Sequence, residues 1–220
     1  MQLTFEQIRH NDEVNTYIRQ ADASLESMGF TEHSFAHVGR CAHEAASILE
    51  TLGYPERTIE LARIAGYLHD IGNVVNRVDH AQSGAIMAFR ILDKLGMEPA
   101  ETAAVITAIG NHDEDTACPV NELAAALILA DKSDVRRTRV RSKETIAFDI
   151  HDRVNYAVEQ SSLSVDREAR VLTLRLTIDS SICPILEYFE IFMNRMLLCR
   201  RAAAFFGLRF GIVINGQVMM

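Results

Sequence analysis

The sequence predicts a mainly α protein, in which a helical bundle is followed by a small C-terminal strand-helix-strand appendage. From the start to about residue 145, apolar residues recur at helical spacing between short polar breaks. The segment VLTLRLTID, residues 171–179, instead alternates apolar and polar residues, which is the period of a half-buried strand. We therefore expect two parts, residues 1–145 and 146–220.

The helical stretches carry recognisable start and stop signals. One stretch ends at Gly53 before Pro55, the next is followed by Gly72, and a later one opens on Pro99. The predicted helices cover residues 37–53, 56–70, 81–96, 99–112 and 120–135. A further short helix is expected over 153–160, with Asp149 or Asp152 as its N-cap.

The C-terminal part is expected to contain a strand over 171–179, a long helix over 185–207 and a strand over 209–216. Asp179 to Ser181 offer N-caps for that helix, and Pro184 would lie in its first turn. The first strand carries an apolar row of Leu172, Leu174, Leu176 and Ile178. An exposed row of this kind invites association, so we expect the body or a second copy, as in a homodimer, to cover it.

Composition excludes several classes of protein. The formal net charge of −8 argues against a general binder of large nucleic acids or of membrane surfaces. The N-terminus has no apolar signal-peptide core, and the apolar stretch 124–130 is far too short to cross a bilayer. Four scattered cysteines without CxxC spacing are typical of free thiols in a reducing cytoplasm, where we expect the protein to reside.

A set of histidines and aspartates interrupts the apolar helices at their ends. Charged or half-charged groups at such positions cost free energy unless they have partners. Imidazole nitrogen and carboxylate oxygen together suit divalent Mn, Fe, Ni or Zn. The six residues are His37, His69, Asp70, His80, His112 and Asp131.

Five segments carrying these residues, in this order, resemble the HD-domain superfamily of metal-dependent phosphohydrolases. GYLHDIGN resembles the signature doublet and contains His69 and Asp70, and HVGRCAHEAA resembles the first metal-binding helix. DHAQSGAIMA, ITAIGNHDED and LILADKSD are similar to the segments with the remaining ligands. The ligand pattern is closest to the group that hydrolyses dinucleoside polyphosphates.

The resemblance implies a metal-dependent phosphohydrolase that acts on a small phosphorylated or nucleotide substrate through a metal-activated water. It implies one or two transition-metal ions, with Mg²⁺ as an alternative, and assigns all six residues as ligands. Asp70 would bridge two ions, and Asp70 and Asp131 would be the catalytic carboxylates. An HD-fold di-iron oxygenase has the same six-ligand pattern, and a nucleotide-binding regulatory module with little turnover is a third alternative.

The sequence departs from two patterns of this superfamily. Asn73 replaces the lysine that many members carry after HDIG, which removes one expected phosphate contact. The segment NHDEDTACPVNE lacks the His-His-Glu and Gly-Tyr-Pro segments of cyclic-di-GMP phosphodiesterases, so that substrate is not expected.

A basic segment, KSDVRRTRVRSK, begins directly after the last predicted ligand. Arginine and lysine side chains beside a metal site suit phosphate oxygens. We expect Lys132, Arg136 and Arg137 to orient the substrate phosphate, although runs of charge often form only a solvated helix face.

Several similar residues are not expected to bind metal. His33 lies one turn before His37 and is interpreted as a surface or pocket residue. The second pair, His151 and Asp152, lacks both a long apolar helix before it and a glycine after it. The acidic segment 113–115 is interpreted as a solvated turn.

Overall fold

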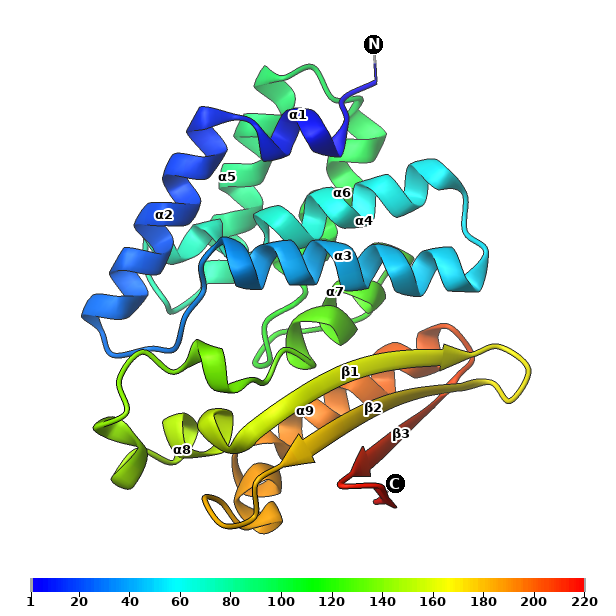
Figure 1. Ribbon diagram of the computed structural model, residues 1–220. Coiled ribbons are helices and arrows are strands. Elements are labelled where there is room, and N and C mark those ends of the chain that lie inside the picture. The colour runs from blue at the N-terminus through cyan, green and yellow to red at the C-terminus, as the bar shows by residue number, and fades with distance from the viewer. Residues whose placement is uncertain (1, 220) are drawn as a thin grey trace.

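The computed structural model describes residues 2–219 and contains a helical body above a four-stranded sheet (Figure 1). The fold is mainly α, as predicted. The helices are α1 (Phe5–Arg9), α2 (Asp12–Ser27), α3 (Phe35–Leu52), α4 (Glu56–Leu68), α5 (His80–Lys94), α6 (Pro99–Gly110), α7 (Glu122–Lys132), α8 (Ile150–Ala157) and α9 (Ile185–Phe205). Across the described residues, none of the helices has both the length and the apolar composition that a bilayer crossing requires.

Close contacts at two glycines bring the helices of the body together around the predicted ligands. A Cβ on Gly66 of α4 would lie 2.7 Å from the backbone nitrogen and Cα of Ala42 on α3. A Cβ on Gly72, in the short 3-10 helix Ile71–Val74, would lie 2.0 Å from the carbonyl oxygen of His80. Only glycine permits such approaches, so Gly66 fixes how α4 packs against α3, and Gly72 fixes how the 3-10 helix after α4 packs against α5.

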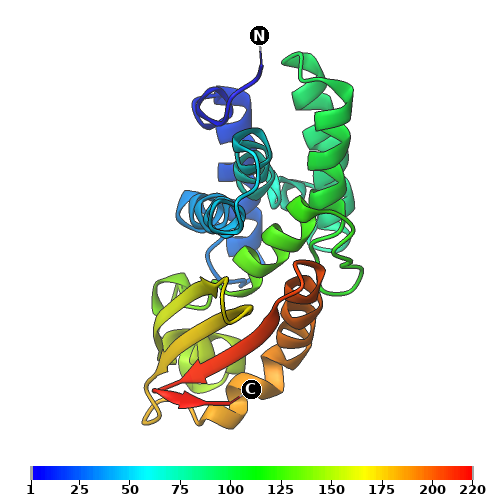
Figure 2. The same cartoon turned by 90° about the vertical axis from the view of Figure 1, so that its right-hand side faces the viewer.

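The sheet has the order β1–β2–β3–β4, formed by β1 (Val158–Asp166), β2 (Val171–Ile178), β3 (Arg209–Ile214) and β4 (Gln217–Val218). β1 and β2 are antiparallel, whereas β2 and β3 are parallel and are connected through α9. Figure 2 shows α9 lying along one face of the sheet. A parallel pair needs such a crossover connection, and the long helix provides it.

The predicted apolar row on β2 is buried. Leu172, Leu174, Leu176 and Ile178 are all at most 3% exposed and belong to a hydrophobic cluster with residues of α9. Ala125, Ile128 and Leu129 of α7 belong to the same cluster. The row is therefore buried within one chain, in a cluster that α9 and α7 share. α7 also contributes Leu123, Ala124 and Leu127 to the core of the body, so both clusters contact this helix.

The C-terminal part contains more than the predicted strand-helix-strand unit. The helix expected over 153–160 ends at Ala157, and residues 158–166 form β1 instead. The Asn215–Gly216 turn leads into the short β4, which pairs with β3. Helix α9 begins at Ile185 with Pro184 as its N-cap, while Asp179 accepts from the backbone N–H of Ser181 in the preceding turn. The predicted division at residue 145 stays a prediction.

Candidate metal centre

The six predicted ligands come from five separate segments and meet in one cluster. His37 lies in the first turn of α3, His69 and Asp70 follow α4, and His80 is the first residue of α5. His112 follows α6, and Asp131 lies in the last turn of α7. All except Asp131, whose side chain is 12% exposed, belong to the buried polar residues. Helix ends therefore deliver every side chain to the same place.

His37, His69, Asp70 and Asp131 form the first half of the cluster. Oδ2 of Asp70 lies 3.4 Å from Nε2 of His37 and 3.3 Å from Nε2 of His69. Oδ1 of Asp131 lies 3.4 Å from Nε2 of His37 and 3.9 Å from Nε2 of His69. Ligand atoms about 3 to 4 Å apart can share an ion whose bonds are about 2 Å long. This half can therefore hold one divalent ion.

His80 and His112 form the second half together with the other oxygen of Asp70. Nε2 of His80 lies 3.2 Å from Nε2 of His112 and 3.5 Å from Oδ1 of Asp70. Asp113, interpreted as part of a solvated turn, has Oδ1 3.9 Å from the same nitrogen of His80. The two oxygens of Asp70 therefore face different histidines, Oδ2 toward His37 and His69 and Oδ1 toward His80.

Hydrogen bonds to backbone carbonyl groups fix the orientation of three of the four imidazole rings. Nδ1 of His69, His80 and His112 lies 2.8, 3.0 and 2.6 Å from a backbone carbonyl oxygen three residues earlier. A carbonyl oxygen only accepts, so each Nδ1 must donate, and Nε2 of the neutral ring keeps its lone pair. Metal-binding histidines in proteins are commonly oriented in this way.

Two polar residues that were not predicted as part of the site position its ligands. Nδ1 of His37 donates to Oδ2 of Asp134 over 2.8 Å, and both side chains are fully buried. Nδ2 of Asn73 donates to Oδ1 and to the backbone oxygen of Asp70, each over 3.0 Å. Asn73 thus orients the carboxylate of Asp70. The lysine expected at this position from the resemblance would instead have contacted phosphate.

The surroundings favour the metal-binding protonation states of Asp70, His80 and His112, whereas Cys41 and the hydrogen bonds to Asp131 and Asp134 outweigh burial and raise the pKa of His37. Burial raises the pKa of Asp70, but the close histidines, His69 first, outweigh it and hold that pKa well below its usual range. Burial lowers the pKa of His112 well below its usual value and also lowers that of His80. Anionic carboxylate and neutral imidazole are the forms that bind a divalent ion.

Two atoms at the centre of the cluster support occupation by a cation. Nε2 of His69 and Oδ2 of Asp70 are buried and have no hydrogen-bond partner. Leaving such groups unpaired in a protein interior is costly, whereas an ion bound to both would satisfy them. Cys41 lies nearby, with Sγ 3.7 Å from Nδ1 of His37, but burial raises the pKa of its thiol to about 11. The histidine and aspartate cluster therefore fits a metal ion.

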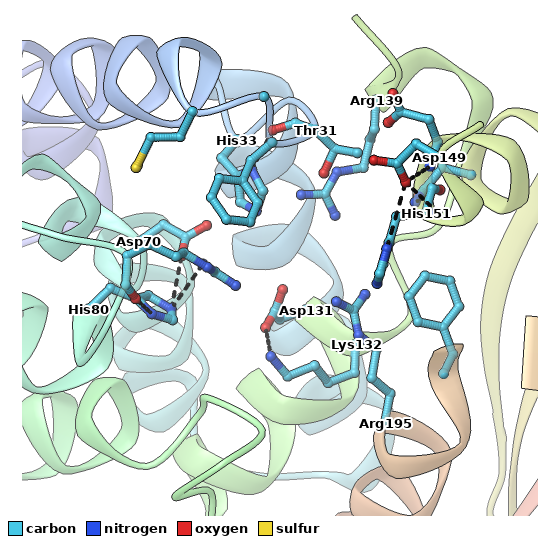
Figure 3. Close-up of a pocket in the computed structure, with 17 residues that line it drawn as sticks. Thr31, His33, Asp70, His80, Asp131, Lys132, Arg139, Asp149, His151 and Arg195 are labelled. Carbon is cyan, nitrogen blue, oxygen red and sulfur yellow. Dashed lines mark hydrogen bonds and ion pairs between the residues drawn. The ribbon is translucent and has the colours of Figure 1, made fainter. Parts of the chain in front are cut away.

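The cluster opens onto a cavity of about 380 Å³, which Asp70, His80 and Asp131 line at one end (Figure 3). Asp149 and His151 lie at the opposite end. Four cationic side chains line the space: Arg77, Lys132, Arg139 and Arg195. The rings of Phe30 and Phe192 also line the cavity, and each packs beneath an arginine, with guanidinium carbons 5.7 and 4.3 Å from the ring centroids.

The structure brings one of the three predicted phosphate ligands to this cavity. Nζ of Lys132 lies 2.7 Å from Oδ2 of Asp131. Arg136 and Arg137 do not line the cavity: Arg136 pairs with Asp134 at 2.7 Å, and Arg137 donates to the backbone oxygen of Tyr156 over 2.6 Å. The arginine of this segment that does line it is Arg139.

The remaining histidines lie outside the cluster of six. His33 lines the cavity and its ring packs against that of His37 at a centroid distance of 5.3 Å. His151 also lines the cavity, but its side chain is 62% exposed and its ion-pair neighbour is Asp149 at 3.7 Å. Asp149 is the N-cap of α8, accepting from the backbone N–H groups of His151 and Asp152. Of the two predicted caps, Asp149 is confirmed, whereas Asp152 lies inside the helix.

Comparisons with known proteins identify the family of this chain. The family model described as "HD domain" matches residues 34–157. An uncharacterized protein of Methanocaldococcus jannaschii, MJ1020, is 25% identical over 174 residues, which cover 68% of this chain and 66% of that protein. The crystal structure of a predicted HD superfamily hydrolase from an uncultured Thermotogales bacterium matches with 27% identity and a TM-score of 0.46, covering 58% of this chain and 69% of that one. Because the family model spans more than half of its length, the chain belongs to the HD domain family.

Proposed function

We propose that this protein is a metal-dependent phosphohydrolase that cleaves a phosphoester or phosphoanhydride bond of a small, nucleotide-like substrate. Membership of the HD domain family supports this chemistry in general, because HD domains bind divalent metals. The observation that carries the proposal is the buried cluster with its unpartnered Oδ2 of Asp70 and Nε2 of His69, opening onto a cavity lined by cations.

In this proposal His37, His69, Asp70 and Asp131 hold one ion, and His80 and His112 hold a second that shares Asp70. Divalent ions bound there would supply a water of lowered pKa and offset the charge on phosphate oxygens. Asn73 and Asp134 keep Asp70 and His37 in place through the hydrogen bonds described above.

The cationic residues around the cavity are proposed to orient the phosphate groups. Lys132 lies beside Asp131, and Arg77 lies 3.4 Å from Nε2 of His80, so both are adjacent to the predicted ions. Arg139 and Arg195 line the same space. Planar guanidinium groups pair with phosphate oxygens through two parallel hydrogen bonds, which fixes orientation as well as charge.

The rest of the cavity lining supports a substrate with an organic part beyond its phosphate. Phe30 and Phe192 offer ring surfaces on which a planar group can stack. Asp149, His151 and Asn155 offer hydrogen-bond partners for hydroxyl or amino groups. A nucleoside has both features. All four cysteines are free thiols, in keeping with the reducing cytoplasm in which we place this reaction.

The test combines elemental analysis with a substrate panel. Protein purified without added metal should contain a transition metal, or should bind one when reloaded. Phosphate release from nucleoside mono-, di- and triphosphates and dinucleoside polyphosphates, measured under anaerobic conditions after reloading, should identify turnover. Turnover that requires oxygen would contradict the proposal and favour the di-iron oxygenase. Tight nucleotide binding without phosphate release would favour the regulatory module.

A further inference from the structure

A second cleft, of about 740 Å³, lies among the first four helices, away from the ligands of the metal centre. Side chains of α1, α2, α3 and α4 line it, and these helices lie together in the N-terminal region (Figure 1). None of the six predicted metal ligands belongs to its lining. Its volume is within the range of about 300 to 1,000 Å³ that is usual for small-molecule sites.

The lining of this cleft is basic, although the whole chain carries a net charge of −8. Arg9, Arg19, Arg40 and Arg63 contribute guanidinium groups, and two histidines add imidazoles. Among the described residues that line the cleft there is no carboxylate. A concave surface with one sign of charge concentrates its field and favours an anionic ligand.

Two of the four arginines are not engaged by acidic side chains. Within residues 2–219, the half-buried Arg63 has neither a hydrogen bond nor an ion pair. Arg19 donates a hydrogen bond to the hydroxyl of Thr16 over 3.2 Å. Arg40, by contrast, lies 3.2 Å from Asp134. Buried or half-buried guanidinium groups are usually paired, so Arg63 has capacity for an external anion.

An aromatic surface accompanies these charges. The ring of Phe35, 38% exposed, stacks on Tyr67 with a centroid distance of 6.5 Å and an interplanar angle of 27°. The guanidinium carbon of Arg19 lies 5.9 Å from the centroid of the Phe35 ring. An exposed ring beside arginine is a surface on which a planar, electron-rich group can stack.

We propose that this cleft binds a nucleoside phosphate, separately from the substrate cavity. Arg19 and Arg63 pair with the phosphate oxygens, and Phe35 stacks against the base. The proposal does not depend on the hydrolytic function, because it uses no residue of the metal centre.

The test is calorimetric titration of the whole protein in EDTA, so that metal-bound phosphate does not contribute. The probes are ATP, inorganic tripolyphosphate and adenosine. ATP should bind more tightly than tripolyphosphate, which lacks the ring, and than adenosine, which lacks the charge. Absence of ATP binding at millimolar concentration, or equal affinity for ATP and tripolyphosphate, would overturn the proposal.

Three variants locate the binding. Arg63→Gln should weaken ATP binding about tenfold or more while leaving the melting temperature unchanged, because its side chain has no hydrogen-bond or ion-pair partner among residues 2–219. Phe35→Leu should remove the preference for ATP over tripolyphosphate. Arg195→Gln, in the substrate cavity, should keep the ATP binding that Arg63→Gln weakens. ATP binding that is lost in Arg195→Gln but kept in Arg63→Gln would place the nucleotide in the substrate cavity and overturn the proposal. If Arg63→Gln folds poorly, Arg19→Gln replaces it in the titration and should likewise weaken ATP binding.

Discussion

His37 and Asp134 form a fully buried hydrogen bond, Nδ1 to Oδ2 over 2.8 Å, between the start of α3 and the segment that follows α7. Asp134 also lies 3.2 Å from Arg40, 2.7 Å from Arg136 and 3.8 Å from Arg139. Burial raises the pKa of Asp134, but His37, Arg139 and Arg136 outweigh this effect and hold the pKa down. The carboxylate therefore orients a predicted metal ligand and is itself held by three cations.

Asp134→Asn should weaken metal binding, because an amide polarises the His37 ring less than a carboxylate does. Loss of such supporting groups usually costs about 10- to 100-fold in metal affinity. Competition with a fluorescent chelator measures this. Arg136→Gln is the matched control, since it removes a contact of Asp134 and keeps the bond to His37. Equal loss of affinity in both variants would indicate a general loss of packing.

Lys132→Gln should raise KM about tenfold or more in the substrate assay, because it removes a charged partner for phosphate beside Asp131. Arg137→Gln is the comparison, since Arg137 packs on Tyr156 at 4.7 Å and does not line the cavity. Its kinetic constants should stay near those of the unaltered protein. A raised KM in Arg137→Gln with an unchanged KM in Lys132→Gln would show that Arg137, and not Lys132, contacts the substrate.

The two His-Asp pairs should respond differently to alanine. His69→Ala removes a buried predicted ligand and should lower metal content and abolish turnover. His151→Ala removes an exposed side chain at the far end of the cavity and should keep the metal. Metal per chain in identically prepared samples decides between them. Loss of metal in His151→Ala but not in His69→Ala would show that the metal binds at the second His-Asp pair instead of the first.

Gly66→Ala should destabilise the protein by about 1 to 3 kcal/mol or more, because its Cβ would overlap the backbone of α3 at 2.7 Å. Gly39→Ala is the control within a helix, where nothing lies within 4 Å of the added atom. That substitution should be neutral or stabilise by about 0.5 to 1 kcal/mol. Denaturant unfolding of both variants measures the difference, and equal effects would contradict the close approach of α4 to α3.

Local sequence patterns predicted much of the helical body and which candidate ligands meet. His69, Asp70 and Asp131 stand at ends of apolar helices, and this can be read within a few residues of each. Asp134 gave no such signal, because its task depends on a hydrogen bond to a residue 97 positions away. Asn73 likewise became interpretable only when its amide was seen to contact Asp70.

Side-chain direction after α7 explains the different outcome for the basic segment. The short 3-10 helix Arg137–Arg139 directs Arg139 toward the cavity, while Arg136 turns to Asp134 and Arg137 to Tyr156. Spacing along the chain does not contain this information. Strand β1 was missed for a related reason, since most of its residues are polar and at least partly exposed and its apolar pattern is weak.

The three carbonyl-oriented histidines have a consequence for how the protein would acquire its metal inside a cell. A centre whose nitrogens are already directed inward needs little rearrangement to accept an ion, so it has little means of rejecting a competitor of similar size. Affinity for such ligand sets generally increases from Mn²⁺ toward Cu²⁺ and is also high for Zn²⁺. The ion found in purified protein should then follow the growth medium, and mismetallation by Zn²⁺ should be a hazard during overexpression.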